Sequence, residues 1–337
     1  MSEVNKVMSV PFVDLKKQYN NIKIEIDNAI QNVIDETAFI KGKYVNTFEK
    51  EYAKQYNVKH CISCGNGTDA IYITLKSLNI GPGDEVITVA NTWISTAETI
   101  SQTGAKPVFV DIHPDFYTID VKKIKEKITV NTKAIIPVHL FGQPCDMDEI
   151  IQICDAHSLH LIEDCAQAHF AKWNNQNVGT YGLAGTFSFF PGKNLGAYGD
   201  AGAIITNSDE FAEKVRMFAN HGALVKHHHE IEGVNSRLDG LQAAILSVKL
   251  KYIKAWNKSR FENALFYNKL LSGNKNIVIP KISKNASHVF HLYVIRCKDR
   301  EGLMKHLKDL NIGVSIHYPT PLPFLKAYEY LNHKHKD

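Results

Sequence analysis

The stretch that decides the fold is Ala134–His169, which reads AIIPVHLFGQPCDMDEIIQICDAHSLHLIEDCAQAH. Its first residues, Ala134–Val138, are fully apolar. Met147–His157 then has the pattern of a helix, and a second apolar run follows at His160–Ile162. Strands that are apolar on both faces and alternate with helices are typical of a parallel sheet covered by helices. The stretch therefore predicts one strand–helix–strand unit.

The same alternation extends outward from this unit. It predicts strands at 60–63, 85–90, 106–110 and 203–206, and helices at 22–34, 48–56, 68–78, 96–103, 121–128, 211–218 and 240–253. After about residue 255 the alternation weakens, and we expect strands at 289–297 and 313–317 around a helix at 302–310. We predict an α/β fold with a large domain at 1–254, including an N-terminal helical segment, and a small α+β domain at 255–337.

The composition is that of a soluble globular protein, with 44% hydrophobic and 22% charged residues in a chain of 337. The net charge of +4 is far from the dense basic patch that nucleic-acid binding requires. No apolar stretch approaches the roughly 18 residues of a membrane span, and the first ten residues show no signal pattern. We expect a cytoplasmic protein that binds neither nucleic acid nor membranes.

The cysteines and histidines do not predict a metal site. Six cysteines are too few for a disulfide scaffold, so we expect buried, reduced thiols. Cys61 and Cys64 have the spacing of half a zinc site or a redox pair, but no second such pair follows. Three adjacent histidines, His227–His229, cannot all face one metal from a regular element, so a solvated loop is the better interpretation.

A glycine-containing loop, Gly65–Ala70, follows a predicted strand and opens a predicted helix. Close backbone approach and the free N–H groups of a helix N-terminus predict a phosphate site there. The loop also matches the dinucleotide fingerprint, which requires an acidic residue at the end of the next strand. Asp84 and Glu85 have about the right spacing but precede that strand. A Rossmann-type NAD-dependent oxidoreductase stays open as an alternative, as does an ordinary strand-to-helix turn.

Two carboxylates, Glu163 and Asp164, close the apolar strand at 160–162, and Gln167 and His169 follow. A carboxylate at the end of a central strand is costly to bury without a cationic partner. Parallel sheets bind ligands at this edge. Asp164 is therefore a candidate functional residue, with a helix cap or a solvated loop acid as the alternative.

Lys193 lies in FSFFPGKN, residues 187–194, after three phenylalanines. An amine in apolar surroundings has a lowered pKa and becomes nucleophilic. Ser188 adds a hydroxyl that could reach a phosphate, and Trp93 follows a strand and could cover a flat ring or belong to the core. A lysine, a carboxylate and an anion site together fit one cofactor, pyridoxal 5′-phosphate.

Several motifs occur together in the chain: Val10–Leu15, Gly67–Ala70, Glu163–His169, Phe187–Phe189 with Lys193, Gly199–Gly202, Gly233–Asp239 and His317–Pro319. In combination they resemble the nucleotide-sugar aminotransferases of the DegT/DnrJ type, from residue 10 to about residue 331. The resemblance implies the fold-type-I architecture of pyridoxal-phosphate-dependent transferases, with a mostly parallel central sheet sandwiched by helices. It also implies an obligate homodimer with shared active sites.

The resemblance further implies a role for each matching residue. Lys193 resembles the lysine that forms the Schiff base and later shuttles a proton, and Asp164 resembles the partner of the pyridine nitrogen. The other implied cofactor contacts are Gly67, Thr68 and Ser188 at the phosphate, Trp93 on the ring, Gln167 at the ring hydroxyl, and Asn235 from the neighbouring subunit. Pyridoxamine phosphate would be the intermediate cofactor form. A related branch with histidine in place of the lysine dehydrates sugars, so Lys193 indicates transamination.

Weaker motifs imply the substrate class. Residues 167–169, 220–222 and 316–325 look most like those of enzymes that aminate dTDP-linked 3-keto-6-deoxyhexoses with L-glutamate, giving a 3-amino sugar for lipopolysaccharide or another surface glycan. The candidate substrate contacts are His169, His317, Tyr318, Lys226 and His227. Amination at C-4 and a non-catalytic binding relative stay open as alternatives.

Two features depart from the family pattern. Many relatives carry a histidine a few residues beyond Pro319, where this chain has Leu322-Pro323-Phe324. The chain also ends at Asp337, some tens of residues before the usual family end. We therefore expect the small domain to be shortened.

Overall fold

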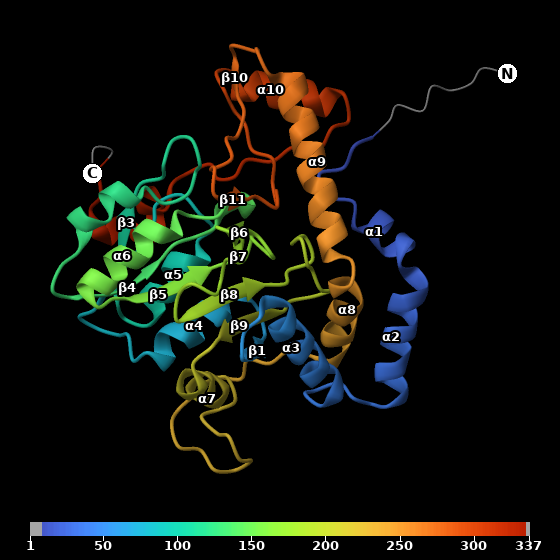
Figure 1. The fold of residues 1–337 in the computed structure, drawn as a ribbon, viewed down its shortest axis with the longest axis vertical. Helices are drawn as coiled ribbons and strands as arrows, with labels where there is room; N and C mark the ends of the chain where they lie inside the picture. The colour runs from blue at the N-terminus through green and yellow to red at the C-terminus, as the bar shows by residue number, and fades with distance from the viewer. Residues whose placement is uncertain (1–8, 335–337) are drawn as a thin grey trace.

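The computed structural model describes residues 9–334 and is built around a seven-stranded sheet (Figure 1). The strand order is β1-β9-β8-β5-β4-β2-β3. The strands are β1 (His60–Cys64), β2 (Glu85–Val89), β3 (Lys106–Val110), β4 (Thr132–Ile136), β5 (His160–Asp164), β8 (Ala184–Ser188) and β9 (Gly202–Thr206). Only β9 runs against its neighbours, β1 and β8. The predicted mostly parallel sheet is confirmed.

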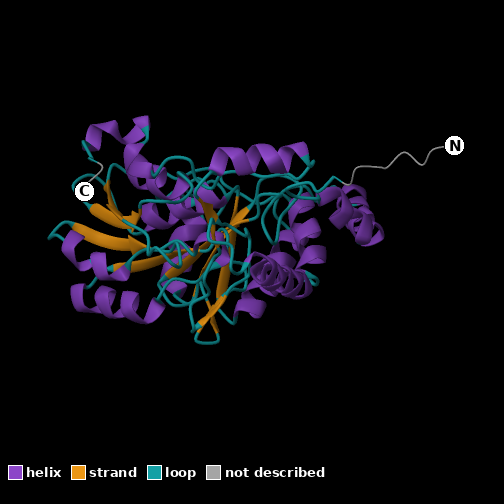
Figure 2. Ribbon diagram, turned by 90° about the horizontal axis from the view of Figure 1, so that it is seen from above, coloured by secondary structure: helices purple, strands orange, loops and turns teal. Residues whose placement is uncertain are grey.

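Helices cover both faces of this sheet, as Figure 2 shows from above. Neighbouring strand residues point to opposite faces, so Ile205 packs in one part of the core and Ile204 in another. The first face is covered by α3 (Lys43–Tyr56), α6 (Met147–His157) and α8 (Gly240–Leu250). The second is covered by α4 (Gly67–Ser77), α5 (Ser95–Gln102) and α7 (Asp209–Phe218). The sheet is therefore sandwiched, as predicted.

Local capping explains where several helices start. Asn66 accepts a hydrogen bond from Asp69 N at the start of α4, and Asp146 and Ser208 cap α6 and α7 in the same way. The helix α6 begins and ends at the predicted residues. Two further helices, α1 (Leu15–Asn21) and α2 (Lys23–Asp35), lie beside α8 at the edge of the molecule (Figure 1).

Two helix predictions are wrong. The segment 121–128 forms only two short 3-10 turns, η1 (Val121–Lys123) and η2 (Lys125–Lys127), because it folds around one fully buried residue, Ile124. The predicted helix 240–253 ends at Leu250, and α9 (Ile253–Leu271) follows it. The sequence pattern did not predict α9, because several of its apolar residues, such as Phe266 and Leu270, are exposed and do not form one buried stripe.

The C-terminal region is less regular than predicted. Its helix α10 (Arg300–Asp309) is present, but within 289–297 only β12 (Arg296–Cys297) forms a strand, paired with β10 (Ile277–Val278). The strand predicted at 313–317 is absent, and Ile312 makes a single bridge to Val10. Val289 N donates to Gly142 O instead of a neighbouring strand, so this backbone is satisfied by contact with the large body.

Short elements connect this region to the rest of the chain. A three-stranded sheet joins β11 (Ala286–Ser287) to β6 (Lys172–Trp173) and β7 (Gln176–Asn177), close to η3 (Leu140–Gly142). The turns η4 (Leu322–Phe324) and η5 (Lys326–Leu331) return to the large body, where Leu322 and Tyr328 pack against Ala97 and Phe109. The domain division near residue 255 stays a prediction.

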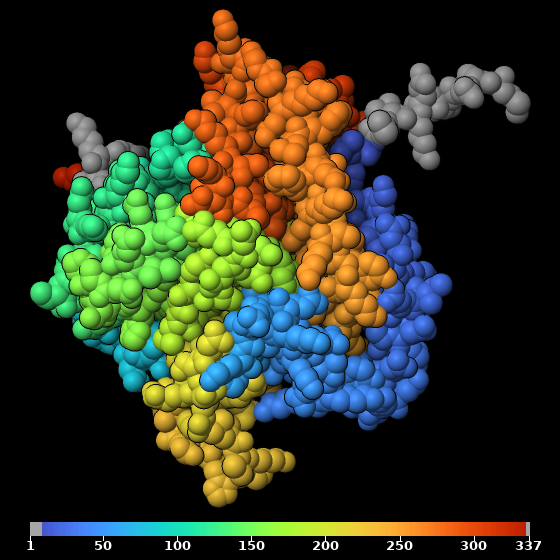
Figure 3. Space-filling model, viewed as in Figure 1, coloured from blue at the N-terminus to red at the C-terminus, as the bar shows by residue number. Residues whose placement is uncertain are grey.

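Part of the segment between α7 and α8, coloured gold, projects from the body (Figure 3). Residues 219–239 contain no helix or strand, and Lys226–His229 are exposed. Within residues 9–334 no helix has the length and apolar character needed to cross a membrane. Most of the N-terminal stretch whose sequence lacks a signal pattern lies outside the described residues.

Candidate active site

Four predicted cofactor residues lie at one edge of the sheet. Asp164 is the last residue of β5, and Ser188 is the last residue of β8. Gly67 begins α4 just after β1, and Trp93 follows β2. The carboxyl ends of these strands are where α/β sheets bind ligands. The fold therefore brings together residues that are far apart in the sequence.

The first turn of α4 touches the end of β8. A Cβ atom added to Gly67 would lie 2.5 Å from Ser188 Cβ and 3.2 Å from Ser188 Oγ, so glycine is needed for this close approach. Thr68 Oγ1 lies 2.7 Å from Ser95 Oγ. A helix N-terminus flanked by hydroxyl groups suits a phosphate, because N–H groups and hydroxyls donate to its oxygens.

Asp164 is a buried carboxylate with only part of its hydrogen-bonding capacity used. Its side chain is 5% exposed, with Oδ2 accepting from Thr96 Oγ1 at 2.8 Å and Oδ1 from Ala166 N at 3.1 Å. Burial raises the pKa of Asp164, while these two hydrogen bonds and the charge of Lys193 oppose the shift. A carboxyl in this environment gains from a cationic partner.

Lys193 lies in the turn that links β8 to β9, and its side chain is electrostatically coupled to Asp164. Burial lowers the pKa of Lys193 to about 8, and the charge of Asp164 opposes this shift. Its backbone N–H donates to Phe190 O at 2.8 Å. An amine with this pKa is uncharged in an appreciable fraction of molecules near neutral pH, which is the form that attacks a carbonyl carbon.

Glu163 precedes Asp164 but has a different environment. It is fully buried, and its carboxylate accepts hydrogen bonds from the backbone of the segment after β7, namely from Gly179 N at 2.6 Å, Tyr181 N at 2.7 Å and Gly182 N at 2.9 Å. Successive strand residues point to opposite faces. The two carboxylates are neighbours in the sequence, but in the structure the Glu163 carboxylate forms hydrogen bonds within the protein.

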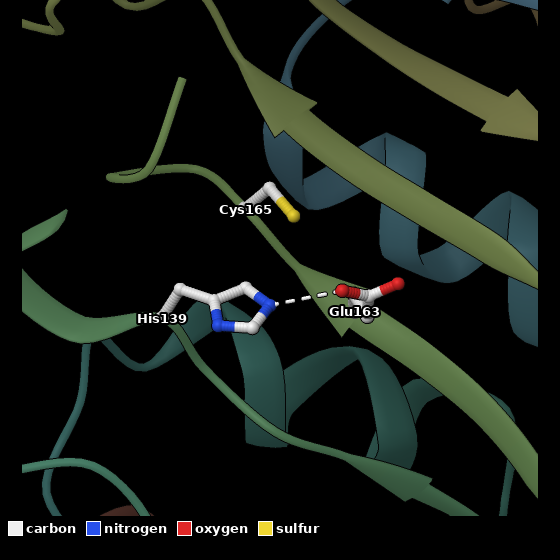
Figure 4. A group of neighbouring side chains, drawn as sticks. All are labelled: His139, Glu163 and Cys165. Atoms are coloured by element: carbon white, nitrogen blue, oxygen red, sulfur yellow. Dashed lines mark hydrogen bonds and ion pairs between the residues drawn. The ribbon is translucent and has the colours of Figure 1, made fainter. Parts of the chain in front are cut away.

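His139, Glu163 and Cys165 lie close enough to hold a metal ion (Figure 4). However, His139 Nδ1 accepts from Cys145 N at 3.0 Å, so its Nε2 carries the hydrogen and donates to Glu163 Oε2 at 3.1 Å. Both ring nitrogens are therefore engaged within the protein. All six cysteines are free thiols, and burial raises the pKa of Cys61 and Cys64, which argues against a reactive pair.

Gln167 connects the strand end to the C-terminal region. It is 4% exposed; its Oε1 accepts from Phe141 N at 2.6 Å, and its Nε2 donates to Tyr318 Oη at 3.0 Å. The rings of Tyr318 and Trp93 are 6.2 Å apart, and Trp93 is 59% exposed. A large aromatic ring with this exposure at a ligand-binding edge is available to cover a flat group.

His169 does not have the surroundings of a substrate contact. It is fully buried, with Nδ1 3.0 Å from Tyr52 Oη and Nε2 2.9 Å from Ser188 O. Burial lowers its pKa to about 3, so it is neutral. Both ring nitrogens have protein partners, which argues against the predicted substrate contact. The His169 ring instead holds the backbone of Ser188 in place through the hydrogen bond to Ser188 O.

The remaining predicted substrate residues lie farther out. His317 is partly buried and stacks on Phe12 with ring centroids 5.8 Å apart. Burial lowers the pKa of His317 and raises that of Tyr318 to about 12, so both are neutral at physiological pH. Lys226 and His227 are exposed on the segment between α7 and α8, part of which projects from the body (Figure 3).

Asn235 is exposed, in a segment that packs against the phosphate loop of its own chain. Its neighbour Ser236 accepts from Gly65 N at 2.9 Å and donates to Asp69 Oδ2 at 2.6 Å. The backbone at Asn235 is thus held near the phosphate loop. Its role in a neighbouring subunit stays a prediction.

Sequence reasoning missed two buried polar residues beside the key groups. Thr96 donates to Asp164, and Asn194 fixes the chain directly after Lys193. Asn194 Nδ2 lies 2.9 Å from Asn257 Oδ1 and 3.1 Å from Val289 O. The position of Asn194 next to Lys193 was an available signal, whereas Thr96 reads as an ordinary helix residue.

Several known proteins are similar to this chain in sequence and fold. The DegT/DnrJ/EryC1/StrS aminotransferase family matches residues 20–337. A pleiotropic regulatory protein of Geobacillus stearothermophilus is 47% identical over 97% of this chain and 88% of its own length. A dTDP-3-amino-3,6-dideoxy-alpha-D-galactopyranose transaminase of Aneurinibacillus thermoaerophilus is 45% identical over 95% of this chain and 88% of its own.

Solved structures give the same result. DesV of S. venezuelae, in complex with a ketimine intermediate, superimposes with a TM-score of 0.94 and 40% identity, covering 96% of this chain and 87% of its own. The ntda protein of Bacillus subtilis, with bound cofactor PMP, gives 0.88 and 35%, covering 96% and 76%. These matches extend over nearly all of the chain and confirm the predicted resemblance and fold class. The chain belongs to the DegT/DnrJ/EryC1/StrS aminotransferase family.

Proposed function

We propose that this chain is a pyridoxal-phosphate-dependent aminotransferase that converts a dTDP-linked 3-keto-6-deoxyhexose into a 3-amino sugar, with L-glutamate as the amino donor. The observation that carries the proposal is the position of Asp164 at the end of β5, next to the parallel strand β8 and the following turn that contains Lys193; the charge of each residue affects the pKa of the other. The product would serve lipopolysaccharide or other surface-glycan biosynthesis. The enzyme would act in the cytoplasm.

The residues present fit pyridoxal phosphate at four places: its phosphate, its ring nitrogen, its ring face and its ring hydroxyl. Gly67, Thr68 and Ser188 would hold the phosphate. Gly67 packs closely on Ser188, so hydroxyl groups lie next to the backbone N–H groups at the start of α4. Asp164, raised in pKa by burial, would hold the ring nitrogen. The exposed ring of Trp93 would stack on the cofactor, and Gln167 would contact its hydroxyl.

The bound cofactor would supply an electron sink for the substrate carbon that carries nitrogen. Asp164 would contribute a negative charge next to the ring nitrogen and so keep that nitrogen protonated. Lys193 Nζ would hold the cofactor covalently and, once released, would carry a proton between the substrate carbon that bears nitrogen and the cofactor carbon C4′. The lowered pKa of Lys193 favours both tasks, because the amine must be uncharged to attack and to accept a proton.

Two further elements belong to this proposal. We infer a homodimer in which Asn235 of each subunit approaches the other subunit's site, because Asn235 is exposed next to the residue that bonds to the phosphate loop. Lys226 and His227 would contact the nucleotide end of the substrate. His317 and Tyr318 would contact the sugar nucleotide, since Tyr318 already bonds to Gln167. Amination at C-4 of the sugar is the alternative reaction of the same site.

The named relatives favour C-3 amination, since one aminates a dTDP-linked sugar at C-3 by its description. Another relative has a regulatory description, which keeps a non-catalytic role as the alternative of a different class. The intact set of Lys193, Asp164 and Gln167 supports an enzyme. The aminotransferase family also disfavours the NAD-dependent alternative, which rested on the glycine loop alone.

Incubation of the purified protein with pyridoxal phosphate, glutamate and a panel of 3-keto and 4-keto sugar nucleotides tests the proposal. We expect a 3-amino sugar, identified by NMR, and no product from Lys193→Ala. A 4-amino product would replace the C-3 assignment with the alternative. Tight NAD(H) binding, or absence of pyridoxal phosphate binding, would refute the proposed function.

A further inference from the structure

A second lysine is buried in the core without an evident task. Lys249 lies in α8 and is fully inaccessible to solvent. Its Nζ donates to Gly196 O at 2.7 Å and lies 4.1 Å from the centroid of the Tyr198 ring. Among residues 9–334, no carboxylate forms an ion pair with it. Burying an amine in this way is unfavourable unless its contacts compensate.

A second side chain of α8, that of Gln242, contacts the same short segment as Lys249. Gln242 Oε1 accepts from Tyr198 N at 2.8 Å. Residues 242 and 249 are two helical turns apart and therefore lie on the same face of α8. The next residue, Gly199, packs so closely on Gln242 that an added Cβ atom would lie 3.0 Å from Gln242 Nε2. Two side chains of α8 thus hold one short segment, 196–199.

This segment belongs to the turn that carries Lys193. Lys193 N donates to Phe190 O at 2.8 Å, and Ala197 N donates to Phe189 O at 2.7 Å. The turn is folded tightly on itself, since a Cβ atom on Gly196 would lie 2.3 Å from Pro191 O. A shift of Gly196 is therefore transmitted to the backbone around Lys193, because closely packed backbone cannot absorb it.

We propose that Lys249, together with Gln242, is a positioning residue that fixes the turn at Gly196 and Tyr198 and so aims the side chain of Lys193 at Asp164. This inference rests on the proposed function only in that Lys193 is the residue that captures the cofactor. Lys249 acts through the turn and contacts no reacting group.

The chemistry of the contact explains why a lysine is useful at this position. Gly196 O lies in a dry region and needs a donor, and a charged donor forms a stronger hydrogen bond than a neutral one. The Tyr198 ring adds a cation–π contact. The pKa of Lys249 is lowered to about 8 by burial, so the amine still carries a proton on most molecules at neutral pH. An apolar residue would leave the carbonyl oxygen unsatisfied.

The rate at which the apoprotein captures pyridoxal phosphate tests this inference. The protein is mixed with the cofactor, the reaction is stopped with borohydride at set times, and the covalent adduct is counted by intact mass. We expect Lys249→Met and Gln242→Leu each to slow capture on the order of tenfold, because small misplacements of a reacting group have effects of this size. The double variant should be slowed by less than the product of the two effects, since both act on one segment.

A matched control separates positioning from general destabilisation. Val215→Ala removes buried side-chain volume from α7, in a part of the core that contains no residue of the turn between β8 and β9. We expect it to lower the melting temperature without slowing capture. Wild-type rates in folded Lys249→Met and Gln242→Leu, or equal slowing by Val215→Ala, would overturn the inference. If Lys249→Met does not fold, Gln242→Leu decides alone.

The experiment also separates this inference from the proposed function. If the wild-type apoprotein forms no adduct at Lys193, the proposed function fails. If the wild type captures the cofactor and the α8 variants capture it equally fast, only the positioning role fails.

Discussion

The turn after β8 contains Lys193 and the last turn of α8 contains Lys249, and burial lowers the pKa of both lysines to about 8. Their surroundings differ. Lys193 is partly accessible, lies in the turn that follows a strand and interacts electrostatically with the carboxyl of Asp164. Lys249 is inaccessible and contacts a carbonyl oxygen and an aromatic ring. A shifted pKa alone therefore does not mark a catalytic group; access and a second charged group distinguish the two.

The largest expected difference between the two lysines is in turnover. Lys193→Ala should lower the rate of amino transfer by about 10³-fold or more, because it removes both the covalent attachment and the proton-transfer group. Lys249→Met should retain turnover within about a hundredfold of wild type. Steady-state assays with glutamate and the sugar nucleotide measure both. Comparable losses in the two variants would contradict the comparison.

The carboxylates of β5 provide the second contrast. Asp164→Asn should reduce turnover by about 10²–10³-fold, since the variant loses the negative charge at the proposed ring nitrogen. Glu163→Gln should instead lower the free energy of unfolding by about 1–3 kcal/mol, because three backbone N–H groups lose a charged acceptor. Parallel kinetic assays and urea titrations measure the two effects. A kinetic loss for Glu163→Gln as large as that for Asp164→Asn would remove the distinction between them.

The pH dependence of stability tests the burial of Lys249. Its pKa is lowered from 10.5 to about 8 in the folded state, so between these values the unfolded chain holds a proton that the folded chain has lost. Stability from this group therefore rises with pH across this window and is constant below it. The free energy of unfolding of wild type relative to Lys249→Met should increase by about 3 kcal/mol from pH 7 to pH 10.5.

Urea titrations across this range measure that difference. The difference between wild type and Val215→Ala should stay constant over the same range, because alanine and valine do not titrate. If the free energy of unfolding of wild type relative to Lys249→Met does not change with pH, the pKa of Lys249 is not lowered in the folded state.

The smallest expected effect concerns the phosphate end of the site. Gly67→Ala places a methyl group 2.5 Å from Ser188 Cβ, so the start of α4 and the end of β8 must separate. Affinity for pyridoxal phosphate should fall by about tenfold, the size of one lost hydrogen bond. Gly81→Ala is the control, since its Cβ atom would meet only Thr103 O at 3.6 Å. Equilibrium titration of the apoproteins measures both, and equal affinities would argue against the phosphate assignment.

Much of the large body was predictable because its signals are local. Apolar strands ending in polar residues predicted Asp164 at the edge of the sheet, and the glycine loop predicted the start of α4. Lys193 stood out because three phenylalanines precede it. These features depend on periodicity and on neighbouring residues, which a sequence contains directly.

The remaining features depend on contacts between distant segments. Lys249 reads as an ordinary helix residue, and only the packing of α8 on the turn after β8 buries it. His169 looked like a substrate contact because it follows Gln167, but Tyr52 and Ser188 occupy its ring nitrogens. The predictions of strands at 289–297 and 313–317 were wrong because the backbone of these segments bonds to the large body and to the N-terminal segment, not to neighbouring strands.

The most direct test of the central claim is to locate the cofactor on the chain. The protein is incubated with pyridoxal phosphate, reduced with borohydride and digested, and the modified peptide is identified by mass spectrometry. The account predicts one pyridoxyl group per chain, on Lys193, and an unmodified Lys249. A label on Lys249 or on another lysine in place of Lys193 would contradict it.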